Sequence, residues 1–102
     1  MKLKRLKGLA HDLAWNLSDE MWFGDYKNLP KEVDRDVLQQ RSKLDKMCVS
    51  FFKYRLPKSF DFNRIKEIRL KIHRTKTAHK IMINIKVDNT GFSYSCWSSM
   101  VR

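Results

Sequence analysis

Residues 68–97 read IRLKIHRTKTAHKIMINIKVDNTGFSYSCW, and the alternation of apolar and polar side chains in this stretch decides the predicted fold. Isoleucine, leucine or valine occupies every second position over residues 68–72 and again over residues 81–87. This period of two is typical of a strand with one buried and one solvated face. The segment Asp-Asn-Thr-Gly at 88–91 is typical of a tight turn. We therefore expect a strand followed by a β-hairpin.

The first half of the chain has a different, helical period. Apolar residues recur at spacings of three and four over residues 3–23, at Leu3, Leu6, Leu9, Ala10, Leu13, Ala14, Leu17 and Met21. This pattern predicts a helix that ends near Gly24. Similar spacing after Pro30 predicts a second helix over about 31–47. Residues 47–54 are rich in β-formers and fit a helix or a strand equally, whereas Pro57 makes 56–63 a turn or loop.

These elements predict the class of fold. With 102 residues, of which 42% are hydrophobic, the chain suits one domain, residues 1–102, with one core. Strands concentrated at the end of a chain, after helices, are typical of an α+β fold. We expect two N-terminal helices packed on a three- or four-stranded antiparallel sheet.

The charge of the chain is unevenly distributed. The net charge is +11, and residues 53–102 account for +9 of it, with twelve Lys/Arg against three Asp/Glu. A positive field of this kind attracts polyanions, of which nucleic acid is the commonest. The leading hypothesis is a small, non-enzymatic domain that binds RNA or single-stranded DNA through a cationic sheet face.

The predicted contacts follow from the alternation of side chains along the strands. Same-face residues of a strand lie about 7 Å apart, a spacing close to that of successive phosphates. A cationic face with an aromatic side chain could hold phosphates and stack on a base. The predicted nucleic-acid-binding residues are Arg69, Lys71, His73, Arg74, Lys76, Lys80, Lys86 and Trp97. The plain alternative is a solvated face whose cations discourage edge pairing.

A second stripe on the first helix suggests a different function. His11, Trp15 and Trp22 lie on the side away from the aliphatic residues. An exposed stripe of this kind would make a protein-interaction module, such as an adaptor, an antitoxin-like partner or an inhibitor. Its partner would be an acidic protein, and a homodimer is another form of the same interface. Residues 47–62, which contain a cluster of aromatic side chains, could instead cover the stripe inside the molecule, and we favour this arrangement.

A third hypothesis is a metal-independent ribonuclease. A helix pair followed by a basic antiparallel sheet is a layout shared with small messenger-RNA-cleaving bacterial toxins, although no motif of that group is present. Arg69, His73, His79 and Tyr94 supply suitable residue types. No catalytic residue is assigned.

The sequence predicts no metal site, no cofactor and no membrane partner. Cys48 and Cys96 lack nearby partners at metal-ligand spacing, and no apolar run reaches the length of a membrane span. The basic start of the chain is interrupted by His11 and Asp12, so we expect no export signal and a cytoplasmic location.

Overall fold

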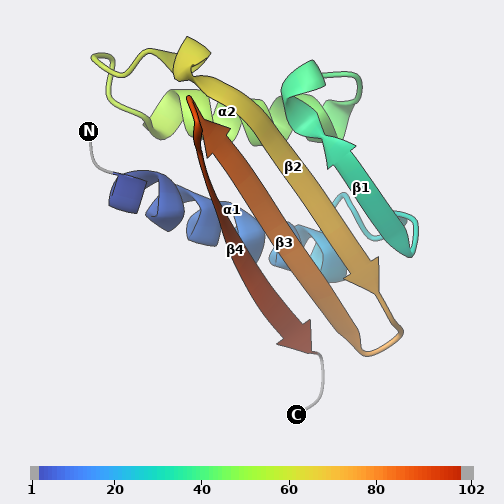
Figure 1. The fold of residues 1–102 in the computed structure, drawn as a ribbon. Helices are drawn as coiled ribbons and strands as arrows, with labels where there is room; N and C mark the ends of the chain where they lie inside the picture. The colour runs from blue at the N-terminus through green and yellow to red at the C-terminus, as the bar shows by residue number, and fades with distance from the viewer. Residues whose placement is uncertain (1–2, 100–102) are drawn as a thin grey trace.

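The computed structural model describes residues 3–99, in which two helices cover one face of a four-stranded antiparallel sheet (Figure 1). The elements in chain order are α1 (Leu3–Phe23), β1 (Glu32–Asp36), the 3-10 helix η1 (Val37–Gln39), α2 (Lys43–Arg55), the 3-10 helix η2 (Phe62–Arg64), β2 (Ile65–Arg74), β3 (Ala78–Val87) and β4 (Thr90–Ser99). The strands lie side by side in the order β1-β2-β3-β4. The two edges of the sheet are therefore β1 and β4.

The predicted strand and hairpin are confirmed. β3 and β4 pair over their full lengths, from Val87 opposite Thr90 to Ala78 opposite Ser99. The loop between them contains only Asp88 and Asn89, and Asp88 has a φ of 53°. Aspartate tolerates this left-handed conformation better than most residues, which explains a tight turn at this point without glycine.

The core lies between the sheet and the helices. Ile68, Leu70 and Ile72 of β2 alternate with polar residues, and none of the three is more than 1% exposed. Isoleucines of β3 and the aliphatic stripe of α1 belong to the same buried cluster. Burying one such side chain contributes about 1.5–3 kcal/mol, so the alternating pattern decides which face of the sheet meets the helices.

The predicted helix at 31–47 is wrong. Residues 32–36 form the short edge strand β1, which pairs with β2, and a 3-10 turn follows. The Asp36 carboxylate accepts the Leu38 N–H and so caps this turn, and Gln40 then adopts a left-handed conformation that ends it. Because β1 comes between them, the two helices are not consecutive along the chain.

The helix α2 begins later than predicted and includes residues 47–54, which settles their ambiguity in favour of a helix. Ser42 is the N-cap, and its hydroxyl accepts the N–H of Asp45. The Asp45 carboxylate accepts the Arg41 N–H and lies 2.8 Å from Arg35 Nε, although Asp45 itself is fully buried. This single acid therefore fixes the backbone just before α2 and ties β1 to the helix.

Candidate nucleic-acid interface

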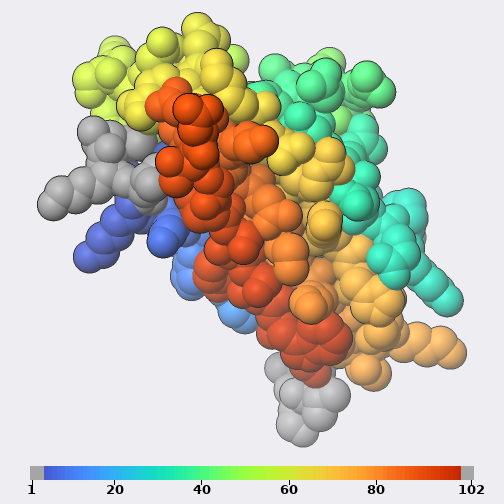
Figure 2. All heavy atoms as spheres, viewed as in Figure 1, coloured from blue at the N-terminus to red at the C-terminus, as the bar shows by residue number. Residues whose placement is uncertain are grey.

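The face of the sheet opposite the helices is open, and Figure 2 shows its four strands side by side. Alternation along β2, β3 and β4 sends Ile68, Leu70 and their equivalents inward and their neighbours outward. Six of the eight predicted contact residues have outward positions: Arg69, Lys71, His73, Lys80, Lys86 and Trp97. The cross-strand register places His73 opposite Lys80, and Lys80 opposite Trp97.

The side of this face near β1 is electrically balanced. Arg69 Nη1 lies 2.8 Å from Asp34 Oδ1, and Arg69 Nη2 lies 3.3 Å from Glu67 Oε2. The hydrogen bond to Asp34, with help from Glu67, raises the pKa of Arg69 above its usual value. His73 Nδ1 is paired with Glu32 Oε1. The acids that neutralise these groups come mainly from β1, the strand that the sequence did not predict.

The other side of the face is different, because β3 and β4 contain no Asp or Glu. The side chains of Lys80 and Lys86 project from β3, and Trp97 on β4 is 57% exposed. We call the outward side chains of these two strands the β3–β4 half. Among residues 3–99, no acid lies within 4.0 Å of the ammonium groups of Lys71, Lys80 or Lys86. These three cations therefore have the capacity to bind an external anion.

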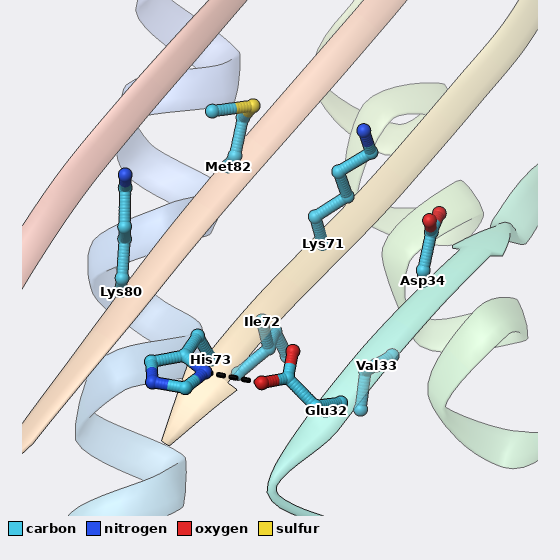
Figure 3. A pocket seen from close by; sticks show the side chains of 8 residues that line it. All are labelled: Glu32, Val33, Asp34, Lys71, Ile72, His73, Lys80 and Met82. Atoms are coloured by element: carbon cyan, nitrogen blue, oxygen red, sulfur yellow. Dashed lines mark hydrogen bonds and ion pairs between the residues drawn. The ribbon is translucent and has the colours of Figure 1, made fainter. Parts of the chain in front are cut away.

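A shallow hollow of about 220 Å³ lies where the two sides meet. Figure 3 shows Lys80 and Lys71 on neighbouring strands with Met82 between them, and the His73–Glu32 pair at one end. Asp34 stands on the far side of Lys71, toward the sheet edge. The hollow is lined by the ammonium groups of Lys71 and Lys80 and also by the carboxylates of Glu32 and Asp34, so it marks the boundary between the acidic and the acid-free sides of the face.

Two predicted contact residues lie outside this row. Arg74 has the same alternation as the buried Ile72, so its side chain is directed away from the open face. Its guanidinium donates to the carbonyl oxygens of Lys27 and Leu29 and so fastens the connector after α1 to the end of β2. Lys76 is exposed in the β2–β3 loop, where it lines a second hollow together with Lys31 and Arg74. The prediction for Arg74 conflicts with this internal role.

The aromatic stripe of α1 is directed at β4. Trp15 Nε1 donates to the Tyr94 hydroxyl at 3.1 Å, and Trp22 Nε1 donates to Ser98 Oγ at 2.8 Å. The intramolecular cover that we favoured therefore exists, but β4 provides it, and the expectation that residues 47–62 do so is wrong. Trp15 remains 41% exposed and His11 lies exposed beside Tyr94.

The four candidate ribonuclease residues are divided between the two faces. His79 is fully buried on the helix side, where its ring stacks on Trp22 at a centroid distance of 3.6 Å. Burial, together with the nearby Arg74 charge, lowers the pKa of His79 below its usual value. Tyr94 lies on the same side, bonded to Trp15. His79 and Tyr94 therefore cannot act with Arg69 and His73 at one phosphate.

Sequence reasoning missed a second group of cations, on α2. The exposed residues Lys43, Lys46, Lys53 and Arg55 lie on this helix, whose only acid is the buried Asp45. Lys53 and Arg55 lie over the rings of Phe62 and Phe51, at 5.1 and 3.7 Å. The boundary predicted at residue 47 concealed this surface, since it divided these cations between two elements.

The two cysteines are buried on the helix side of the sheet. Burial raises the pKa of the Cys48 thiol to about 12, and it also raises the pKa of Cys96. Neither thiol is activated as a nucleophile. Within residues 3–99, no three His, Cys, Asp or Glu side chains are grouped in a way that could hold a metal ion. In the same part of the chain, neither helix is apolar enough over a sufficient length to span a membrane.

Comparison of the chain with protein-family models, with curated proteins and with solved structures finds no match.

Proposed function

We propose that this protein binds single-stranded nucleic acid, RNA or DNA, on the β3–β4 half of its open face. The observation that carries the proposal is the separation of charge across this face. Acids pair with Arg69 and His73 near β1, whereas Lys71, Lys80 and Lys86 have no acidic partner within residues 3–99. Two of these lysines, Lys80 and Lys86, belong to the β3–β4 half, and Lys80 lies opposite the exposed Trp97. Cations and an exposed indole on one face combine the two features that bind single strands.

The dimensions of the β3–β4 half suit an extended strand. Lys80 and Lys86 are six residues apart on β3, a distance of about 20 Å, which is about three nucleotides of a single strand. Trp97 is the cross-strand neighbour of Lys80. A base stacked on Trp97 would thus have its phosphate within reach of Lys80, and the next phosphates would run toward Lys86. The outward side chains between these two lysines are Met82 and Asn84 on β3 and Ser93 and Ser95 on β4, and none of them carries a charge.

The protein-interaction hypothesis has weaker support, because Trp22 and Ser18 of the α1 stripe already bond Ser98 of β4. The proposed function also needs fewer residues than the sequence predicted. Arg69 and His73 contribute less than the lysines, since each must first separate from a carboxylate. Arg74 has no direct role, because its guanidinium is bonded to the connector after α1.

The experiment that tests the proposal is a salt titration of binding to a fluorescent single-stranded oligonucleotide. The double variant K80Q/K86Q should lower the slope of log K against log salt by about 1.4, because each phosphate contact with a single strand contributes about 0.7. W97A should weaken binding by about 1–3 kcal/mol with little change in that slope, and W97F should restore part of the loss.

The matched control is K43Q/K46Q on α2, which removes the same charge from the helix side. K43Q/K46Q should lower the salt slope much less than K80Q/K86Q does, because a direct phosphate contact contributes more to this slope than a distant charge. Should the α2 variant produce the larger change, the contact surface lies on the helices and the proposal is wrong. Absence of binding by the unmodified protein at low salt would also reject it.

A further inference from the structure

The edge strand β4 presents an unusual surface. It contains ten residues, TGFSYSCWSS, with no charged side chain and no proline. Within residues 3–99, no strand lies on its outer side. Long, uncharged edges of this kind readily accept another strand, and proteins usually protect them with charges, prolines or bulges. β4 carries none of these protections, although the molecule has a net charge of +11.

The outward backbone groups of β4 can be assigned from its hairpin. In a two-residue hairpin the closing pair, here Val87 and Thr90, is hydrogen bonded. Every second residue after Thr90 then bonds β3, and the residues between direct their N–H and C=O groups away from the sheet. Ser93, Ser95 and Trp97 form the centre of this outward set. Their side chains lie on the open face.

We propose that β4 pairs antiparallel with β4 of a second copy of this chain, with Ser95 at the two-fold axis. The register follows from the outward set, whose centre is Ser95. Ser95 then faces its equivalent, and Ser93 faces Trp97 of the second copy at both ends. Pairing of these residues would form about six backbone hydrogen bonds and join the two sheets into one continuous sheet.

A second copy fits this edge because the strand is complementary to itself. Each large Trp97 side chain would lie against a small Ser93, and the exposed indole would cover the new seam. No charge on either β4 is brought against a like charge. By contrast, a charged peptide would find no countercharge on this strand.

The helix side of the same edge supports the same occupant. Trp15 is 41% exposed and donates to Tyr94, the neighbour of Ser95 in sequence. Two-fold pairing at Ser95 would therefore bring the two Trp15 side chains to the same side of the seam. The two most exposed tryptophans, Trp15 and Trp97, border β4, one on each face of the sheet.

The first measurement is sedimentation velocity of the full chain over a wide range of concentration. We expect a monomer–dimer equilibrium that strengthens with added salt, because each copy carries a charge of +11. S95K should weaken dimerisation by roughly tenfold, because it sets two lysines face to face at the axis. The control S50K adds the same charge at an exposed position of α2 and should leave the equilibrium unchanged.

The second measurement locates the interface by amide hydrogen exchange. The N–H groups of Ser93, Ser95 and Trp97 should become protected as concentration rises. S93K provides a second variant in case S95K does not fold, as judged by circular dichroism. A chain that stays monomeric throughout, or a dimer whose β4 amides still exchange rapidly, would overturn the inference. Nucleic-acid binding is distinguished from dimerisation because it weakens with added salt, whereas dimerisation strengthens, and the two are measured separately.

Discussion

The two edge strands are attached to the helices by opposite kinds of chemistry. β1 is tied to α2 through an ion pair, Arg35 with the buried Asp45. β4 is tied to α1 by uncharged contacts, in which Ser18 and Trp22 both bond Ser98. The same contrast holds on the open face, where β1 supplies Glu32 and Asp34 and β4 supplies no charge. The charged side chains of β1 are thus paired within the molecule, whereas β4 has no charged side chain to pair.

The largest expected effect comes from breaking the charged attachment. D45A leaves Arg35 without its partner and removes the acceptor of the Arg41 N–H, so it should lower the free energy of unfolding by about 3 kcal/mol. Urea denaturation measures this loss. D12A, which removes the exposed partner of His11, is the control and should change the free energy by less than about 0.5 kcal/mol. Equal effects of the two substitutions would show that β1 does not depend on Asp45.

The attachment of β4 to α1 includes Trp22, whose ring stacks on His79, so the free energy of unfolding should depend on pH. The pKa of His79 is lowered in the folded protein by burial and by Arg74, so the unfolded chain binds a proton more readily. Stability from this group is complete above the ordinary pKa of about 6.5 and declines as the pH falls below it.

The substitution H79F tests this explanation. It keeps the stack on Trp22 and removes two ring nitrogens that have no hydrogen-bond partner within residues 3–99. Urea denaturation of both proteins between about pH 5 and 7.5 should show a flatter profile for H79F than for the unmodified protein. Parallel profiles would mean that His79 is not responsible for the decline.

The smallest expected effect comes from making the β1 side of the face resemble the β3–β4 half. E32Q/D34N removes the partner of His73 and one partner of Arg69. The variant should bind single strands a few-fold more tightly, with a salt slope greater by about 0.7 for one added phosphate contact. D19N/E20Q on α1 removes two charges elsewhere and controls for net charge. Weaker binding by E32Q/D34N would show that those acids support the site.

The sequence predicted the part of the fold that has a clear period. The helix at 3–23 and the hairpin are confirmed because buried residues recur there without interruption. β1 was missed because an edge strand carries charges for protection, and Glu32 to Asp36 therefore shows no alternation. The Ser42–Asp45 cap was overlooked, although its spacing marks the start of a helix.

For the candidate site, the sequence predicted which strand residues share a face but not which of them are paired with acids. Strand alternation placed Lys71, Lys80, Lys86 and Trp97 on one face, and the same parity would have directed Arg74 to the other. The ion pairs of Arg69 and His73 could not be foreseen, since they depend on the unpredicted strand. The tie between Trp22 and Ser98 joins residues 76 positions apart, and local patterns carry no information about such a contact.

We propose that nucleic acid binds the β3–β4 half of the open face. An NMR titration of the labelled protein with a short single-stranded oligonucleotide would locate the contact surface. The largest shifts should occur at the Trp97 indole and at the outward residues of β3 and β4. Shifts concentrated on the lysines of α2, with the Trp97 signal unchanged, would contradict it.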